Sequence, residues 1–207
     1  MKKRGILTVI SGFSGVGKGT LVKKLVEKYD NYALSVSMTT RSPRPGEIDG
    51  VHYFFINKEQ FEQNIADKKM LEYANYVGNY YGTPREYVES MLNAGKDVIL
   101  EIECAGAFQV KEMMPDTLLL FVVPPSADEL YKRLKGRGTE SEEVILGRMK
   151  RAIEEADIVD KYEYMLLNES LEDCVRETHE IIQNEKYSVS RNAEFIKQIK
   201  EEIKLRK

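Results

Sequence analysis

The sequence has few of the residues that crosslink small secreted domains or hold metal ions. Its only cysteines are Cys104 and Cys174, and its only histidines are His52 and His179. Two cysteines without a CxxC pair exclude a disulfide framework and a paired cysteine metal motif. Because each histidine stands alone, we interpret both as structural or surface residues. Reduced thiols and a cytoplasmic location are the expectation.

An excess of charge of one sign is also missing. The 31 Lys and Arg residues nearly balance the 34 Asp and Glu residues, which leaves a net charge of -3. No overall basic field is available for a nucleic acid polymer or a membrane surface, so anions must be held by local clusters. The longest strongly apolar run, residues 117–123, is far shorter than the roughly 20 residues of a membrane-spanning helix. We read it as a buried strand, and the basic and then apolar start, without a cleavage site, as the first strand.

Short β-rich runs alternate with helical stretches along the chain. Strands are predicted at residues 6–10, 33–38, 98–101, 118–123 and 164–167. This alternation predicts an α/β fold with a mostly parallel sheet and helices on both faces. Thr83 and Ser126, each three residues before a glutamate, predict capping boxes at helix starts, and Gly95 predicts a helix end. A length of 207 residues fits one domain.

Three segments depart from the alternation. Residues 51–81 resemble antiparallel strands with one helix at 58–68, which predicts a small lobe inserted into the core. Residues 133–151 are rich in Arg, Gly and Glu, so we expect a mobile, solvent-exposed segment there. The tail from residue 190 onward has apolar residues at helical spacing, and we expect a helix that docks on the core. These apolar residues are Phe195, Ile196, Ile199 and Ile203.

A phosphate-binding loop follows the first strand directly, with the sequence GFSGVGKGT at residues 12–20. Glycines allow the backbone N–H groups to turn inward around a phosphate, and the next helix adds its positive end. Lys18 adds a full charge for the β- and γ-phosphates, which makes it a candidate catalytic residue. The motif predicts an ATP phosphate site at Ser14, Gly15, Val16, Gly17, Lys18, Gly19 and Thr20.

The ending of this loop affects the expected metal site. Gly19 occupies the position after the lysine, where a hydroxyl residue usually binds Mg²⁺, and the GKGT ending resembles that of adenylate kinases. We therefore expect Mg²⁺ to be held mainly by water and phosphate oxygens. Thr20 and Glu101 are the candidate protein ligands, directly or through water. Glu101 ends a predicted strand, and such strand ends face the ligand crevice.

Residues 37–55 carry two arginines among prolines, an arrangement that could clamp a dianion. By composition alone, a surface loop with scattered charge is an equally open interpretation. However, the pattern S-x-T-T-R-x-P-R-x-G-E-x-x-G-x-x-Y-F-F, followed by LEYA and GNYYGT, resembles the GMP-binding lobe of guanylate kinases. Together with the phosphate loop, this resemblance covers nearly the whole chain.

The resemblance implies one guanylate-kinase-like domain over residues 1–207, with a three-layer P-loop kinase core. The core would comprise residues 1–36, 97–132 and 153–207, with a mixed α/β GMP-binding lobe at about 37–96 and a helical lid at about 133–152. The implied reaction is ATP-dependent phosphorylation of GMP, and also of dGMP, by direct in-line transfer. The implied substrates are ATP and GMP, with Mg²⁺ as cofactor.

The resemblance also implies roles for individual residues. The residues that hold the GMP phosphate would be Arg41, Arg44, Tyr53 and Tyr81. Those that face the guanine base would be Ser37, Glu72, Thr83 and Glu103. The catalytic residues would be Lys18, Arg44, Arg133, Arg137 and Arg148. In the same lid we expect Lys135, Lys150 and Arg151 to be merely solvated. Asn168 lies either at the adenine end of ATP or at an ordinary helix start capped by Ser170.

Guanine chemistry agrees with Glu72 as the base-reading residue. Guanine presents two donors, N1–H and the 2-amino group, to a carboxylate, whereas adenine has an acceptor at N1 and no 2-amino group. The family pattern usually has two aspartates and a glutamine where this chain has Glu101, Glu103 and Ala105. The change keeps both carboxylates, each with one more methylene, and loses the amide. It leaves open whether the two acids keep separate roles in metal and base contact.

Two alternatives stay open from the sequence. Some guanylate-kinase-like domains bind phosphopeptides without catalysis, but these typically lack an intact phosphate loop, which is present here. The sequence does not determine the oligomeric state, for which a homodimer is one alternative.

Overall fold

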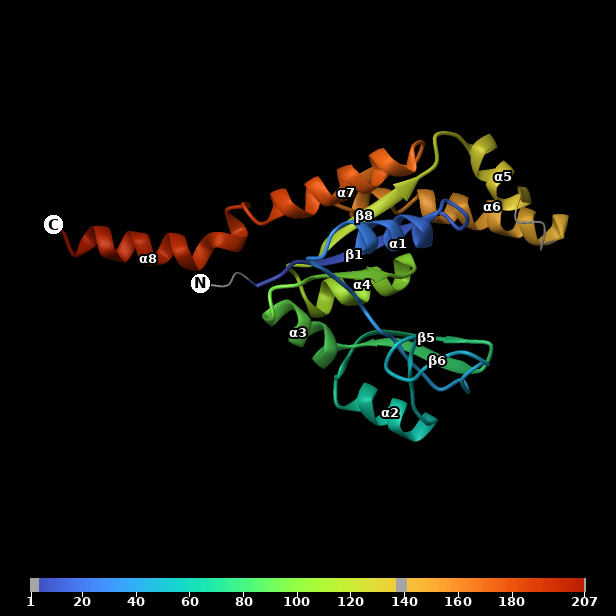
Figure 1. The fold of residues 1–207 in the computed structure, drawn as a ribbon, viewed down its shortest axis with the longest axis horizontal. Coiled ribbons are helices and arrows are strands. Elements are labelled where there is room, and N and C mark those ends of the chain that lie inside the picture. The colour runs from blue at the N-terminus through green and yellow to red at the C-terminus, as the bar shows by residue number, and fades with distance from the viewer. Residues whose placement is uncertain (1–3, 137–140, 207) are drawn as a thin grey trace.

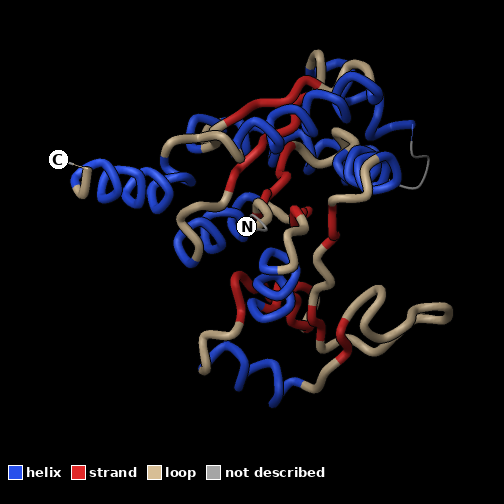
Figure 2. The backbone as a smooth tube through the Cα atoms, turned by 60° about the vertical axis from the view of Figure 1, so that its left-hand side comes forward, coloured by secondary structure: helices blue, strands red, loops and turns tan. Residues whose placement is uncertain are grey.

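Two β-sheets organise the computed structural model, which describes residues 4–136 and 141–206. The larger sheet forms the main body, and the smaller one lies in a lobe beside it (Figure 1). The chain leaves the main body after β2 (Tyr32–Leu34) and returns to it by β7 (Asp97–Glu101). The lobe is therefore an insertion into the main body. The turned view in Figure 2 shows the same separation of the two parts.

The five strands of the larger sheet are all parallel and follow the order β2-β7-β1-β8-β9. Its remaining strands are β1 (Leu7–Gly12), β8 (Leu118–Val123) and β9 (Tyr164–Leu167). Parallel neighbours need crossover connections, which helices provide. The α/β class with a parallel sheet, predicted from the alternation of elements, is confirmed.

Helices cover both faces of the larger sheet. On one face lie α1 (Lys18–Lys28) and α7 (Leu171–Glu185), and on the other lie α3 (Arg85–Asn93) and α4 (Cys104–Met113). Because successive strand residues point to opposite faces, a central strand supplies both cores. β8 shows this directly, since Leu120 joins the core under α1 and Leu119 joins the core under α4. This is the three-layer arrangement expected of a P-loop kinase.

The smaller sheet has the order β4-β3-β6-β5, in which β3 and β4 are parallel and the other pairs are antiparallel. Its strands are β3 (Met38–Thr39), β4 (Phe54–Phe55), β5 (Met70–Tyr76) and β6 (Asn79–Pro84), and α2 (Lys58–Ala66) packs beside them. The strand expected at residues 33–38 is thus divided between two sheets. The division occurs because the chain crosses from the body to the lobe at this point.

The segment expected to be mobile and solvent-exposed contains two helices, α5 (Ala127–Gly136) and α6 (Glu142–Ala156). Leu134 and Ile145, one from each helix, are 1% and 3% exposed in the core beneath α1. These apolar side chains attach both helices to the main body, while most of the described residues of the segment are solvent-exposed, as expected. Mobility of the segment stays a prediction.

The tail forms a helix but does not dock on the core. After η2 (Ser190–Asn192), α8 (Ala193–Lys204) projects away from the main body (Figures 1 and 2). Three of its expected docking residues are exposed, with Phe195 at 62%, Ile199 at 38% and Ile203 at 58%. The prediction of docking was wrong because the helical spacing indicates an apolar face and not what covers it. None of the helices within the described ranges has the length and apolar character that a bilayer span requires.

Candidate active site

The phosphate loop lies at the carboxyl end of β1, where the main sheet meets the start of α1. Gly15 and Gly17 have φ angles of 90° and 101°, a left-handed conformation that glycine adopts without strain. A Cβ on Gly12 would lie only 2.3 Å from a carbonyl oxygen of β8. Lys18 Nζ donates to the carbonyl oxygens of Gly12 at 2.6 Å and Phe13 at 3.2 Å. The glycines and Lys18 thus determine the shape of the loop.

Lys18 and Glu101 influence each other across the sheet edge. Burial lowers the pKa of Lys18, and the nearby Glu101 carboxylate opposes that change. Burial likewise raises the pKa of Glu101, and Lys18 opposes it. Each group therefore favours the charged form of the other, and a bound phosphate would favour the charged form of Lys18 further.

The surroundings of Glu101 fit a magnesium site that depends on substrate oxygens. In the parts of the chain that the structure describes, no three His, Cys, Asp or Glu side chains gather as metal ligands. A Cβ on Gly19 would lie 3.5 Å from both carboxylate oxygens of Glu101, so glycine leaves open space beside them. Thr20 is exposed in the adjacent turn of α1. Mg²⁺ commonly takes one or two carboxylates, phosphate oxygens and water, and this donor set fits that mode.

The predicted acceptor-phosphate residues meet in the lobe. Arg41 donates two hydrogen bonds of 2.9 Å each to Glu47, and its guanidinium lies 5.4 Å from the ring centre of Tyr53. Tyr81 interacts with Arg41 and lies edge-on to Tyr53, with ring centres 6.0 Å apart. Arg44 is exposed nearby, and its backbone N–H donates to Glu47 at 2.7 Å. The structure therefore brings the rings of Tyr53 and Tyr81 together around the guanidinium group of Arg41.

The predicted base-reading residues lie on the same sheet, where Glu72 of β5 pairs with Thr83 of β6, two positions from Tyr81. Glu72 and Thr83 are 8% and 0% exposed, and Thr83 Oγ1 donates to Glu72 Oε1 at 2.6 Å. Burial raises the pKa of Glu72, while the Thr83 hydrogen bonds oppose that rise. Ser37 lies directly before β3, and its carbonyl accepts from Phe54 N–H at 2.8 Å. The capping box expected at Thr83 is absent because its hydroxyl bonds Glu72, and Pro84 precedes α3 instead.

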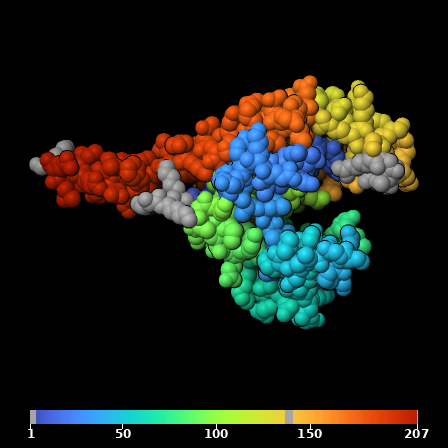
Figure 3. Space-filling model, viewed as in Figure 1, coloured from blue at the N-terminus to red at the C-terminus, as the bar shows by residue number. Residues whose placement is uncertain are grey.

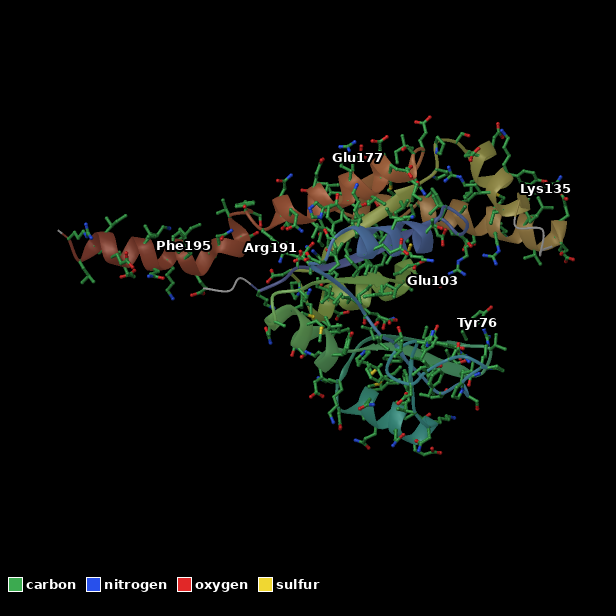
Figure 4. All side chains as sticks on the ribbon, in the orientation of Figure 1. Tyr76, Glu103, Lys135, Glu177, Arg191 and Phe195 are labelled. Carbon is green, nitrogen blue, oxygen red and sulfur yellow. The ribbon has the colours of Figure 1, made fainter. Side chains whose placement is uncertain are left out.

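The base-reading end of the lobe contacts the main body through α4. A Cβ on Gly106 would lie 3.1 Å from Glu72 Oε2, so α4 approaches the carboxylate closely at this glycine. Glu103 precedes α4 as its N-cap residue, and its side chain is 72% exposed. Figure 4 shows Glu103 on the side of the main body that faces the lobe. The space-filling view in Figure 3 shows an open hollow between the lobe and the body on the side of α5 and α6.

Two of the predicted lid arginines contact the phosphate loop. Arg133 Nη1 donates to the Val16 carbonyl at 3.2 Å, and Arg148 Nη1 donates to Ser14 Oγ at 2.5 Å. Arg137 lies outside the described residues. The lid helices α5 and α6 therefore place cationic groups at the loop expected to hold the ATP phosphates.

Asn168 also serves the phosphate loop. The residue is 6% exposed, and its side-chain Nδ2 donates to the Val16 carbonyl at 2.8 Å. The backbone carbonyl of Asn168 accepts from Arg133 Nη2 at 3.0 Å. Ser170, two residues later, is the N-cap of α7 and accepts from Asp173 N–H at 3.3 Å. The buried amide of Asn168 is thus directed at the loop, and a contact with adenine stays a prediction.

Comparison with protein families decides the relationship. The family model described as guanylate kinase matches residues 4–185 of this chain. The chain belongs to the guanylate kinase family.

Individual relatives extend this similarity to nearly the full length. A guanylate kinase of Oceanobacillus iheyensis is 50% identical over 202 residues, covering 98% of both chains. One of Lactococcus lactis is 48% identical over 205 residues, covering 99% of this chain and all of the relative. The crystal structure of guanylate kinase from Anaplasma phagocytophilum superposes with a TM-score of 0.69 at 32% identity, covering 92% of this chain and 90% of the other.

Two residues of this guanylate kinase family member were missed by the sequence analysis. Glu47 holds Arg41 in place, and that pairing lowers the pKa of Glu47 to about 2. An acid placed six residues after one arginine and three after the next was the available signal. Arg151, which was expected to be solvated, is 51% exposed, and its Nη2 also donates to Glu103 Oε2 at 2.6 Å. Sequence spacing does not predict that pair, because Arg151 lies on α6 and Glu103 lies at the start of α4.

Proposed function

We propose that the chain transfers the γ-phosphoryl group of ATP to GMP, and also to dGMP, with release of ADP. The observation that carries this proposal is the buried Glu72 carboxylate, hydrogen-bonded by Thr83, in a lobe that faces the phosphate loop across a hollow. Membership of the guanylate kinase family supports the same reaction.

Guanine recognition follows from the base-reading end of the lobe. Glu72 accepts from N1–H and the 2-amino group of guanine, and Ser37, Thr83 and Glu103 complete the polar edge. Adenine would leave the buried carboxylate facing an acceptor without donors, at a cost of about 1–3 kcal/mol or more. The site therefore rejects AMP by polar mismatch and not by size.

The two phosphate sites consist of different groups. The acceptor phosphate is held by Arg41, Arg44, Tyr53 and Tyr81, and the ATP phosphates are held by Ser14, Gly15, Val16, Gly17, Lys18, Gly19 and Thr20. Arg41 is already oriented by Glu47 and by the Tyr53 ring. This arrangement reduces the side-chain ordering that GMP binding requires. Asn168 would approach the adenine end of ATP.

The main requirement of the reaction is to bring two anionic phosphate groups together. A strong general base is not needed. The attacking oxygen belongs to the GMP phosphate, which is largely ionised because its second pKa is about 6. That oxygen attacks the γ-phosphorus in line as the bond to the β,γ-bridging oxygen breaks. The catalytic cations offset the repulsion and meet the charge that develops on the transferring group. They are Lys18, Arg44, Arg133, Arg137 and Arg148.

Glu101 and Thr20 would hold Mg²⁺ beside Lys18, directly or through water. When bound with ATP, the ion supplies further neutralisation of the β- and γ-phosphate oxygens. Closure of the lid helices over the loop would keep water from accepting the phosphoryl group. A cytoplasmic location is proposed as well, supported by the free thiols Cys104 and Cys174.

An ADP-release assay with ATP and Mg²⁺ tests the proposal, with GMP, dGMP, AMP, CMP and UMP offered in parallel. Turnover is expected with GMP and dGMP and not with the other three. Lys18→Ala is expected to reduce that turnover by about 10³-fold or more. Absence of turnover from folded protein would contradict the enzyme and favour the alternative, a phosphopeptide-binding module that uses Arg41 and Arg44.

A further inference from the structure

α6 directs three charged side chains to the active site from one helix face. Arg148, Arg151 and Glu155 are spaced three and four residues apart, which places them on the same side of the helix. Arg148 Nη1 donates to Ser14 Oγ in the phosphate loop at 2.5 Å. Arg151 Nη2 donates to Glu103 Oε2 at the start of α4 at 2.6 Å. One helix therefore contacts both the donor side and the acceptor side of the site.

Glu155 lies beside Arg151 on the same helix face. Its side chain is 12% exposed, and its Oε1 lies 3.5 Å from Arg151 Nε. Burial raises the pKa of Glu155, and Lys18, Arg151 and the Ser14 backbone oppose that rise. Glu155 and Glu103 are thus both paired with Arg151, while Arg148 on the same face bonds the phosphate loop. We call Glu103, Arg148, Arg151 and Glu155 the lid relay.

The acceptor end of the lid relay depends on Arg151. Glu103 is 72% exposed, and within residues 4–136 and 141–206 Arg151 is the side chain that holds it by an ion pair or hydrogen bond. Three residues further on, Gly106 lies against Glu72 Oε2. Glu103 therefore precedes, by about one helical turn, the glycine that approaches the carboxylate proposed to read guanine. Without Arg151 its long side chain would rotate freely and lose that freedom when GMP binds.

We propose that Arg151 is a positioning residue that orients Glu103 toward guanine and makes GMP affinity depend on the occupancy of the phosphate loop. The inference rests on the proposed function. Arg151 engages Oε2 of Glu103 and leaves Oε1 to accept from the donor edge of guanine. A nucleotide that holds α6 against the loop, through Arg148, also holds Arg151 and therefore Glu103. Binding at one site then favours binding at the other.

The length of the acid agrees with this role. The family pattern usually has an aspartate where this chain has Glu103, and the extra methylene extends the carboxylate toward α6. A longer acid on α4 and an arginine on α6 form a matched pair. Glu103→Asp should therefore weaken the lid relay while it keeps a carboxylate near guanine.

Isothermal titration calorimetry of GMP, with and without a non-hydrolysable ATP analogue and Mg²⁺, measures the coupling between the sites. In the unaltered protein the analogue is expected to tighten GMP binding by about 5-fold or more. Arg151→Met and Glu103→Asp should reduce that factor below about 2-fold, and Arg151→Lys should give an intermediate value because one ammonium cannot hold both acids in the same way. Lys150→Met, at an exposed neighbour on α6, is the matched control and should keep the full factor.

A double variant separates positioning from a general structural effect. If Arg151 acts through Glu103, the two substitutions are not additive. In the double variant with Arg151→Met and Glu103→Gln, the factor by which the ATP analogue tightens GMP binding should then be no smaller than in either single variant. Full coupling in folded Arg151→Met, or no coupling in the unaltered protein, would overturn the inference. If Arg151→Met does not fold, Glu103→Asp decides the same question. Failure of the unaltered protein to bind or phosphorylate GMP would instead contradict the proposed function.

Discussion

Asn168 Nδ2 donates a 2.8 Å hydrogen bond to the carbonyl oxygen of Val16, so the start of the last core helix is tied to the middle of the phosphate loop. Asn168→Ala would remove this buried bond and leave Arg133 as the remaining donor to that carbonyl. We expect a loss of about 1–2 kcal/mol in the free energy of unfolding. This corresponds to a fall of about 2–8 °C in Tm for a domain of this size.

Differential scanning calorimetry and ATP kinetics check this prediction together. Because the loop would lose a support, the KM for ATP should rise more than the KM for GMP. Asn184→Ala, at an exposed position of α7, serves as the control and should leave both quantities unchanged. An unchanged Tm in Asn168→Ala would show that the bond does not stabilise the loop.

Glu72→Gln should lower kcat/KM for GMP while leaving the fold intact. Hydrogen bonds to a charged group contribute about 1.5–3 kcal/mol, so a loss of about 10- to 150-fold is expected. Burial already raises the pKa of Glu72, which means that the native state disfavours its charge. The neutral variant should therefore keep or increase Tm. Steady-state kinetics with GMP and AMP measure the effect, with Glu86→Gln on the exposed face of α3 as control.

The same carboxylate predicts how GMP affinity changes with pH. Its pKa in the free protein lies above the ordinary value of 4.5, and GMP needs the ionised form. Affinity should therefore weaken as pH falls toward that raised pKa, in a range above pH 4.5. The GMP phosphate, with a second pKa of about 6, adds a dependence shared by every variant. Glu72→Gln should retain only that shared part, and identical pH profiles for the two proteins would contradict the assignment.

The sequence predicts the fold and the composition of the site better than the pairings within it. β8 and the phosphate loop were predictable because a buried run and a fixed glycine spacing are local properties. The Glu103 and Arg151 pair was not, since it depends on how α6 lies against α4. Thr83 illustrates the same limit. Its hydroxyl was expected to cap a helix and instead donates a hydrogen bond to Glu72 on the neighbouring strand. α8 was predicted as a helix, but its environment is not encoded in its own apolar spacing.

Glu47→Gln should weaken GMP binding more than it slows the chemical step. Glu47 orients Arg41 through two hydrogen bonds of 2.9 Å, and an amide can accept only one of them and carries no charge. We expect KM for GMP to rise about 5-fold with kcat little changed, because the lost orientation affects bound GMP and the transition state alike. Glu59→Gln, exposed on α2, is the control. A fall in kcat alone would contradict this role.

The Arg41 and Glu47 pair should also survive mild acid. Arg41 lowers the pKa of Glu47 to about 2, so the interaction is fully present above the ordinary value of 4.5 and is lost only as pH falls through about 2. Any loss of GMP affinity between pH 7 and 4 must then come from other groups. Glu47→Gln should accordingly shift the KM by a similar factor across that range, and a factor that vanishes near pH 5 would contradict the lowered pKa.

Removal of residues 193–207 should leave the enzyme folded and active, because α8 projects away from the main body. The family model ends at residue 185, before this helix begins. Phe195, Ile199 and Ile203 are exposed, so their loss takes little apolar surface out of a core. We expect Tm to change by less than about 2 °C and kcat/KM for GMP by less than about 2-fold. A fall in Tm of more than about 5 °C would mean that α8 packs against the body in solution, and the docking first expected from its apolar spacing would then be restored.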